Sequence, residues 1–245
     1  LLAYASTSDC VVVVQEILTM ISSIPDEKTR TSSLESRVPK DGIVGLGIPG
    51  GMTALIAAMF SSRSEIVSLL LEHGADPLAP DVLGNDPLMF ASIFGRTDNV
   101  KFWLKKFPDW DLERRNTVVG GVALGQALFM GPHRLELVRV LLEHGASIDY
   151  RTDTGGNVLT ALCLSEDCDP ELLRFIVTKV QNDEINHKYR GRTLKWRSIH
   201  RIAKILTRSK FTSSGLITSL AHESGSTALH YAVRRGDVDV VDLLL

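Results

Sequence analysis

The sequence has few cysteines and no long apolar run, and each absence excludes a class of protein. Its three cysteines, Cys10, Cys163 and Cys168, are an odd number without regular spacing. They therefore do not form the disulfide framework of a small secreted domain, and we expect a reducing compartment, the cytoplasm or the nucleus. No segment approaches the roughly 18 consecutive apolar residues of a membrane-spanning helix. We expect no transmembrane segment in this sequence.

Motifs for cofactor or metal chemistry are also missing. Gly45-Leu46-Gly47 lacks the spacing of a dinucleotide-binding loop, and no strand pattern precedes it. Cys163 and Cys168 could join the distant His187 around a zinc ion. No second Cys/His pair has ligand spacing, however, which favours a buried thiol and a loop thiol. We expect no cofactor and no metal.

What the sequence does contain is one recurring apolar pattern. Leu55, Ala58, Val67 and Leu71 recur at the same internal spacing in two other places. The recurrences are Leu88, Ala91, Val100 and Leu104, then Leu229, Ala232, Val241 and Leu245. Each copy reads as a Gly-led turn, a short helix, a loop and a second helix. Two short helices cannot bury their apolar faces alone, so the pattern predicts a stacked repeat array.

The repeated segments resemble the ankyrin family. GMTALIAAM (51–59), GNDPLMFAS (84–92) and GSTALHYAV (225–233) are similar to its G-x-T-P-L-H-x-A-A signature. LLLEHGADP (69–77) and LLEHGAS (141–147) are similar to its second-helix ending. The resemblance implies an all-α, helical-hairpin solenoid with β-turn hairpin tips.

The period also suggests how the chain is divided. The first helix begins at the very start of the chain, and the last ends before its cap glycine, so we expect a fragment of a longer array. We expect a truncated repeat at 1–24, a long flexible loop at 25–50, four repeats at 51–180, a basic helical insert or degenerate repeat at 181–224, and a truncated final repeat at 225–245.

The resemblance implies a non-enzymatic protein–protein interaction scaffold that binds its partner on the concave face. The positions would be hairpin tips and the exposed ends of first helices. Carried over residue by residue, they form the predicted partner-binding set: Phe60, Val82, Leu83, Ile93, Phe94, Phe129, Met130, Leu164, Arg234 and Arg235. A contiguous apolar strip of this kind marks an interaction site. The alternative is that these side chains fill gaps between repeats or lie under the loop at 25–50.

No catalytic arrangement is expected either. Thr227 and His230 could be a nucleophile and a base, but in ankyrin-like repeats these positions link neighbouring turns by hydrogen bonds. A different function class remains open, in which the array regulates an enzyme or ion channel outside this fragment.

One segment has the opposite charge to the rest of the chain. From Ile185 to His222 there are nine basic residues and no acidic one. A predicted amphipathic helix at 194–208 carries four of them on one face, as the stripe Arg197, Arg201, Lys204 and Arg208. This stripe could be a solvated surface, or it could bind an acidic peptide or anionic lipid. Nucleic acid is disfavoured, because Trp196 lies on the apolar side rather than among the basic residues.

Overall fold

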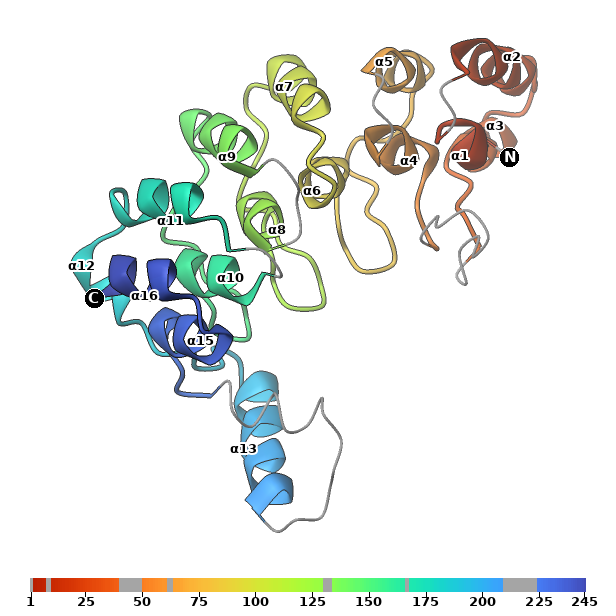
Figure 1. The fold of residues 1–245 in the computed structure, drawn as a ribbon. Helices are drawn as coiled ribbons and strands as arrows, with labels where there is room; N and C mark the ends of the chain where they lie inside the picture. Colours follow the sequence, from red (N-terminus) through yellow and green to blue (C-terminus); the bar gives the residue numbers. More distant parts are fainter. Residues whose placement is uncertain are drawn as a thin grey trace.

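The computed structural model describes residues 2–7, 10–39, 50–60, 64–129, 134–165, 168–208 and 224–245. These residues contain helices and no strand. Figure 1 shows the helices as a curved array of pairs, with one helix of each pair on the inner side and its partner on the outer side. The predicted all-α, helical-hairpin solenoid is confirmed.

The described residues contain six such pairs. The inner helices are α1 (Leu2–Ala5), α4 (Ala54–Phe60), α6 (Pro87–Ile93), α8 (Ala123–Phe129), α10 (Val158–Leu164) and α15 (Ala228–Arg235). The outer helices are α2 (Val11–Ser22), α5 (Ser64–Glu72), α7 (Thr97–Lys106), α9 (Arg134–Glu143), α11 (Pro170–Val177) and α16 (Val238–Leu244). Helices α3 (Glu27–Leu34), α12 (Asn182–Ile185) and α13 (Leu194–Arg208) lie outside these pairs. Within the described ranges, none of the helices combines the length and apolar character required to cross a bilayer.

Local sequence explains where the helices start and stop. Asp169 caps the start of α11: its Oδ1 accepts a hydrogen bond from the Glu171 amide at 2.9 Å, and Pro170 follows as the first helical residue. The second helix of the repeat at 51–77 ends near Gly74, whose φ of +87° is strained for any residue with a Cβ. His73 supports the same end, because its Nδ1 lies 2.9 Å from the Leu69 carbonyl oxygen.

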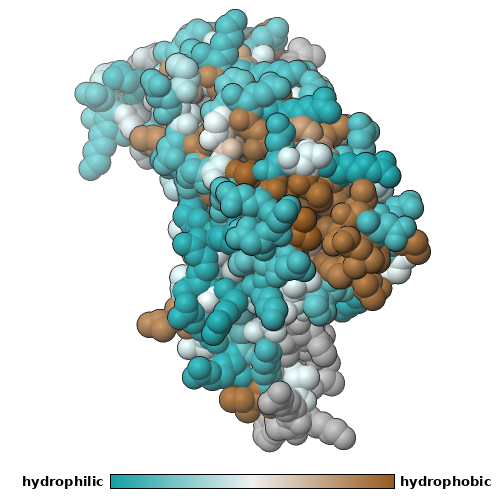
Figure 2. All heavy atoms as spheres, turned by 90° about the vertical axis from the view of Figure 1, so that its left-hand side faces the viewer, coloured by the Kyte–Doolittle hydropathy of each residue, from teal (hydrophilic) through white to brown (hydrophobic). Residues whose placement is uncertain are grey.

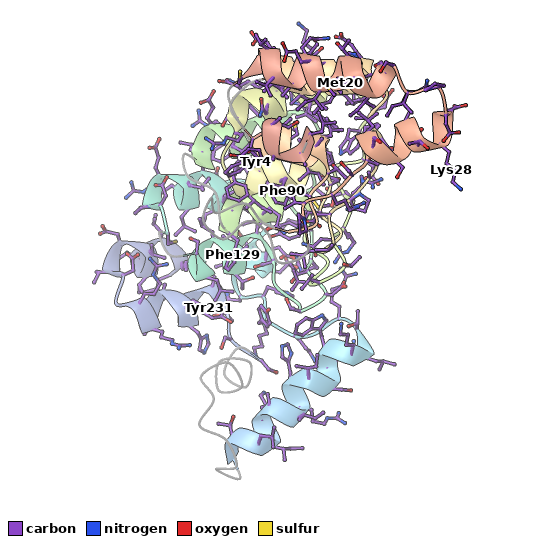
Figure 3. All side chains as sticks on the ribbon, turned by 90° about the vertical axis from the view of Figure 1, so that its right-hand side faces the viewer. Tyr4, Met20, Lys28, Phe90, Phe129 and Tyr231 are labelled. Atoms are coloured by element: carbon purple, nitrogen blue, oxygen red, sulfur yellow. The ribbon has the colours of Figure 1, made fainter. Side chains whose placement is uncertain are left out.

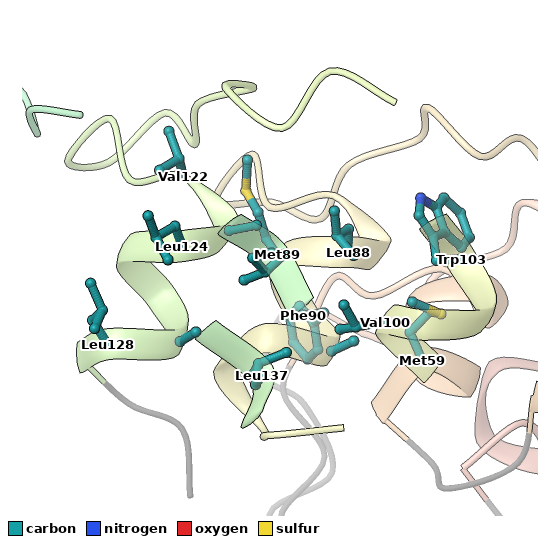
Figure 4. Packing of buried hydrophobic residues seen from close by; sticks show 14 of the residues in the cluster. Met59, Leu88, Met89, Phe90, Val100, Trp103, Val122, Leu124, Leu128 and Leu137 are labelled. Carbon is teal, nitrogen blue, oxygen red and sulfur yellow. The ribbon is translucent and has the colours of Figure 1, made fainter. Parts of the chain in front are cut away.

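The core runs along the array between the two layers. Each inner helix contacts the inner helix of the next pair, as α6 contacts α8 and α8 contacts α10. The repeated leucines of these helices, Leu88, Leu124 and Leu159, are all buried. Figure 4 shows Leu88 and Met89 on α6 facing Leu124 on α8, with Val100 and Leu137 from the outer layer beside them. Burial is therefore shared between neighbours, as a stacked array requires.

The hairpin tips are joined to one another by backbone hydrogen bonds. The Thr117 amide donates to the Leu83 carbonyl at 2.9 Å, and the Asp153 amide donates to the Val119 carbonyl at 2.7 Å. Within one tip, Asp81 Oδ1 accepts from the Leu83 and Asn85 amides, both at 2.8 Å. Side-chain bonds of this kind from an aspartate to nearby amides stabilise the turn. The tips consequently form a continuous row along the inner side of the array.

The segment at 25–50 differs from the expected loop. Helix α3 occupies Glu27–Leu34 and packs against α2. Asp26 caps it, with the Thr29 amide donating to Asp26 Oδ2 at 2.7 Å, so a local capping signal outweighs the polar composition that suggested a loop. Val38 then pairs with Met52, the Val38 amide donating to the Met52 carbonyl at 2.9 Å. Residues 40–49 lie outside the described residues.

For 181–224, the structure favours the insert over the degenerate repeat. Helix α15 packs directly on α10, and α16 packs on α11, so no helix pair lies between them. The Tyr189 amide donates to the Ser226 carbonyl at 2.7 Å, which matches the bond from the Asp81 amide to the Asn85 carbonyl at 2.9 Å. The chain between Tyr189 and Ser226 is therefore an insertion in a hairpin tip. Helix α13, which has the predicted bounds 194–208, projects from the array there (Figure 1).

Candidate partner-binding surface

The predicted partner-binding set divides into a packed part and an open part. Phe60 and Phe94 belong to the packed part. Their ring centroids lie 4.6 Å apart in an edge-to-face arrangement, and Phe94 also stacks on Phe90 at 5.4 Å. The Arg96 guanidinium covers the Phe60 ring at 5.4 Å, and its Nε donates to the Phe60 carbonyl at 2.7 Å. These two aromatic side chains, like Ile93, are half-buried in the junction between repeats.

The open part begins at Phe129, the last residue of α8. Its side chain is 46% exposed, the most exposed of the described inner-helix residues in the set apart from the two arginines. Figure 3 shows Tyr4, Phe90, Phe129 and Tyr231, one from each of four inner helices, following one another along the array. Leu164 occupies the matching position on α10 and is half-buried. Met130 lies outside the described residues.

Phe129 and Leu164 form walls of one pocket of about 280 Å³. The pocket lies between α8 and α10 and extends to the hairpin tips, where Tyr150 and Tyr189 line it. Its remaining walls are mainly glycines and short polar side chains: Gly121, Gly125, Gly156, Thr152, Thr154, Asn157 and Thr160. The two predicted residues thus meet at a concave site whose other members the repeat pattern did not identify.

Tyr150 closes one side of this pocket and is 4% exposed. Its hydroxyl has no hydrogen-bond partner in the described part of the chain. A Cβ on Gly125 would lie 2.6 Å from that oxygen, so the phenol ring occupies space that only glycine leaves open. Burial raises the pKa of Tyr150 well above its ordinary value, so the hydroxyl is a neutral donor and acceptor at physiological pH.

Polar contacts at the base of α10 hold the pocket in shape. Asn157 caps the helix by accepting from the Thr160 amide at 3.0 Å, and its Nδ2 donates to the Glu184 carbonyl at 3.0 Å. Glu184 also pairs with Arg151. Burial acts to raise the pKa of Glu184, but hydrogen bonds from Asn157 and Arg151 and the Arg151 charge outweigh it and lower that pKa. Glu184 is therefore ionised at neutral pH and joins two repeats.

The other predicted positions lie around this centre. Val82 and Leu83 are exposed at a hairpin tip, where Val82 covers Gly51 so closely that a Cβ there would lie 2.3 Å from Val82 Cγ1. Arg234 and Arg235 are exposed at the end of α15, and Arg235 donates to the Ser165 carbonyl. Arg235 thus also links α15 to the preceding repeat.

The residues considered for catalysis or metal binding have structural contacts. Thr227 caps α15, with its Oγ1 2.8 Å from His230 Nδ1, as the hydrogen-bonding interpretation predicted. Cys163 and Cys168 are both buried, and a hydrogen bond with Cys168, then burial, raises the pKa of the Cys163 thiol. His187 is engaged elsewhere, its Nε2 lying 2.9 Å from the Gly155 carbonyl oxygen. In the ranges that the structure describes, no three His, Cys, Asp or Glu side chains are grouped to hold a metal ion.

The basic stripe on α13 borders a second pocket, of about 350 Å³. Arg197, Arg201 and Lys204 line it, together with His200, which sequence reasoning missed. The side chain of Arg208 lies outside what the structure describes.

An apolar area on the last repeat was also missed. Figure 2, which views the side where α11 and α16 lie in Figure 1, shows hydrophobic side chains gathered in one area. Val233 of α15 and Val238 of α16 are among the most exposed apolar residues of the molecule.

Comparison with known proteins identifies the repeats. A family model described as ankyrin repeats, in three copies, matches residues 40–116, and the single ankyrin repeat model matches residues 224–245. Ankyrin repeat and SAM domain-containing protein 6 of Mus musculus is 33% identical over 95 residues, which is 39% of this chain and 10% of that protein. Tyrosine-protein kinase HTK16 of Hydra vulgaris is 30% identical over 122 residues, 50% of this chain and 16% of that protein. The matched region is thus a small part of each relative.

Two solved structures share the fold over nearly the whole chain. The ankyrin repeat protein EF0377 superposes with a TM-score of 0.63 at 21% identity, covering 99% of this chain and 95% of that one. An ankyrin repeat domain from Acinetobacter baumannii AYE superposes with a TM-score of 0.60 at 20% identity, with the same coverage. Two family models thus identify ankyrin repeats at residues 40–116 and 224–245, and the fold of ankyrin repeat structures extends over the chain that joins them.

Proposed function

We propose that the chain is a non-enzymatic scaffold that binds a partner protein on its concave face, at the pocket between α8 and α10. Ankyrin repeats are in general protein–protein interaction modules, and the repeats here supply the rigid framework that such a site needs. One observation supports this binding site: Phe129 is exposed and also lines a concave pocket. Exposed aromatic residues next to pockets are frequent anchors of binding energy.

The pocket has the dimensions of one large side chain rather than of a whole cofactor. Its volume of about 280 Å³ is at the lower end of small-molecule sites. Phe129, Leu164 and Val119 provide apolar walls, and the polar groups sit at the hairpin end. An extended peptide could place one apolar or aromatic residue here while its backbone follows the row of hairpin tips, which includes Val82 and Leu83.

Peptide selection on the immobilised chain tests this proposal. Selected peptides should share one large apolar residue, and Phe129→Asp should weaken the best of them about 30-fold, the loss expected for a binding anchor. Because Phe129 is exposed, its replacement should leave the urea midpoint nearly unchanged.

Leu78→Asp is the matched control. Leu78 is 52% exposed, close to the exposure of Phe129, lies in the turn between α5 and the hairpin tip at Asp81–Asn85, and does not line the pocket. The affinity of the Leu78→Asp variant for the same peptides should equal that of the unmodified chain. Peptides that bind Phe129→Asp as tightly as the unmodified chain would place the partner site elsewhere.

One observation supports a second function class, the regulatory one. In it, the array regulates an enzyme or channel on the same polypeptide. The partial match to a tyrosine-protein kinase of Hydra vulgaris motivates it. The two functions separate experimentally, since a regulatory array would change the activity of an attached domain when Phe129 is replaced. The free thiols Cys10, Cys163 and Cys168 favour the cytoplasm or nucleus for either role.

The basic helix α13 offers an independent surface for an anionic partner, an acidic peptide or an anionic lipid. Nucleic acid remains disfavoured, because Trp196 is half-buried on the packed side of the helix, 6.0 Å from the His200 ring.

A further inference from the structure

The insertion between Tyr189 and Ser226 encloses a basic pocket at its root. Arg190, Arg197, Arg201 and Lys204 contribute four cationic side chains to its lining, and the pocket volume is about 350 Å³. No carboxylate belongs to the lining formed by the described residues. Four like charges around one concavity repel each other unless an anion lies between them.

Two of these cations are held in place by hydrogen bonds, and none of the four forms an ion pair with the described residues. Arg197 Nε donates to the Gly191 carbonyl at 2.9 Å, and Lys204 Nζ donates to the Ser224 carbonyl at 3.0 Å. Both contacts use one donor of a group that has several. They fix the two side chains to the chain segments that enter and leave the insertion. Arg201, one turn before Lys204, is exposed at the mouth of the pocket.

His200 supplies the observation that distinguishes this pocket from a solvated charged face. It lines the pocket, is only 3% exposed, and its Nε2 has no hydrogen-bond partner among the described residues. The centroids of the Tyr189 and Trp196 rings lie 5.8 Å and 6.0 Å from that of the His200 ring. Buried polar atoms without a hydrogen-bond partner are rare, so this nitrogen is available to a ligand in the pocket.

The helix that lines the pocket also carries exposed apolar side chains. Ile205 lines the pocket and is 58% exposed, while Ile202 and Leu194 are exposed elsewhere on α13. The helix projects beyond the repeat array in Figure 1, so these side chains are not covered by other helices of the array. A cationic pocket beside exposed aliphatic residues on a projecting helix has the composition of an interfacial membrane-binding element.

We propose that this pocket binds the phosphate monoester of a lipid head group, with Ile202 and Ile205 entering the membrane surface beside it. A phosphate monoester carries up to two negative charges and three strong acceptor oxygens, which suits four cations and a buried imidazole better than a single carboxylate does. The exposed isoleucines favour a membrane over a phosphorylated peptide. The site is independent of the pocket between α8 and α10, so either can fail without the other.

Vesicle flotation with the whole 245-residue chain tests the proposal. The chain should bind phosphatidylcholine vesicles that contain phosphatidylinositol monophosphate more tightly than phosphatidylserine vesicles of equal surface charge. Arg201→Gln should weaken this binding by about tenfold or more, since it removes a charge-assisted hydrogen bond to the phosphate. Its melting temperature should not change, because Arg201 is exposed.

Lys195→Gln is the matched control, since Lys195 lies on the same helix, is exposed and does not line the pocket. Lys195→Gln should weaken vesicle binding by about fivefold or less, because it loses only the general attraction of one charge to the membrane surface. Ile202→Ser should weaken vesicle binding yet leave the affinity for soluble inositol monophosphate unchanged, because Ile202 is exposed and does not line the pocket. Equal losses for Lys195→Gln and Arg201→Gln, or equal binding to both anionic vesicles, would overturn the proposed pocket.

A readout at His200 separates the membrane from a phosphorylated peptide. Burial, and then the charge of Lys204, lowers the pKa of His200 in the free chain. Arg190, Arg197 and Arg201 are the other charged groups around the pocket, and an anion among them should raise that pKa. Nuclear magnetic resonance titration with inositol monophosphate should show this rise. If a phosphoserine peptide raises it while the head group does not, the ligand is a phosphopeptide and the membrane assignment is wrong.

Discussion

Single residues decide where the concave face opens, and Gly125 is the clearest case. A glycine inside a helix costs about 1 kcal/mol relative to alanine, so its position needs a compensating reason. Here the reason is Tyr150, whose hydroxyl would lie 2.6 Å from a Cβ at that position. The equivalent residues in neighbouring repeats, Ile56, Met89 and Thr160, all carry side chains. One missing side chain thus admits the tyrosine that lines the pocket.

Asp86 is a second residue whose surroundings matter more than its type. It caps α6 by accepting from the Met89 amide at 2.8 Å, and it receives the Arg114 Nε–H at 3.1 Å from the next hairpin. Burial raises the pKa of Asp86 above its ordinary value, while the Met89 amide and Arg114 oppose that rise. Arg114 therefore stabilises a buried charge and at the same time joins two repeats.

Arg114→Gln should lower the free energy of unfolding by about 1–3 kcal/mol at neutral pH, the cost of a poorly compensated buried group. Without the guanidinium, the pKa of Asp86 rises further above its unfolded value. The folded state then binds more protons than the unfolded state, so stability falls as the pH rises from the ordinary aspartate range towards neutrality. Urea unfolding of the variant, once near the ordinary aspartate pKa and once at neutral pH, measures this difference in the free energy of unfolding. The double variant Asp86→Asn/Arg114→Gln should lose this additional pH dependence, and an Arg114→Gln loss that is equal at both pH values would contradict the argument.

At the scale of elements, the repeat spacing predicted the helices well but not the connections between them. Leu55, Leu88, Leu124, Leu159 and Leu229 are in register, and each belongs to an inner helix. The insertion in the hairpin tip is about as long as one repeat, so the sequence separation of Leu159 and Leu229 is close to two repeat periods. Residue spacing alone cannot distinguish an inserted loop from a degenerate repeat. The backbone hydrogen bond between Tyr189 and Ser226 makes this distinction.

The end of α7 could not be predicted for a related reason. The usual cap glycine is absent there, and Lys105–Asp109 takes its place. In the structure, an aromatic cluster closes this end instead, with Trp103 4.7 Å from Phe107 and 5.0 Å from Trp110. The binding pockets also depend on contacts that the residue spacing does not reveal. Phe129 and Leu164 follow from the register, whereas Tyr150 and His200 acquire their roles only from contacts between repeats or with the hairpin.

The insertion should be removable without loss of the array. Deleting residues 192–224 leaves Tyr189-Arg190-Gly191-Gly225-Ser226, which has the same length as the turn from Asp81 to Asn85. The hairpin bond between Tyr189 and Ser226 can then persist, and a shorter loop costs less entropy to close. The free energy of unfolding, measured in urea, should change by no more than about 1 kcal/mol, within the range of a surface change.

Two binding measurements complete this test. The deletion should abolish selective binding to phosphoinositide vesicles and leave the affinity of peptides selected at Phe129 unchanged. Loss of the helical signal of α15 and α16 along with that of α13 would show instead that the insertion is part of the core of the last repeat.

At the scale of the whole molecule, stability should be distributed along the array rather than concentrated in one centre. Helix α8 contacts α6 on one side and α10 on the other, in addition to its own partner α9. Helix α16 contacts only α15 and α11 among the described helices with substantial contacts. In a stacked array, a central repeat therefore couples two halves, while the last repeat has one neighbour.

A pair of cavity variants measures this coupling. Leu124 in α8 and Val240 in α16 are both buried, at 0% and 1% exposure, so each truncation to alanine leaves a void. Leu124→Ala should cost about 2–5 kcal/mol and accelerate amide hydrogen exchange in α6, α8 and α10 together. Val240→Ala should cost less, about 1–3 kcal/mol, and accelerate exchange mainly in α15 and α16. Exchange that rises equally in every helix for both variants would mean that the array unfolds as one cooperative unit, and that nearest-neighbour coupling does not describe it.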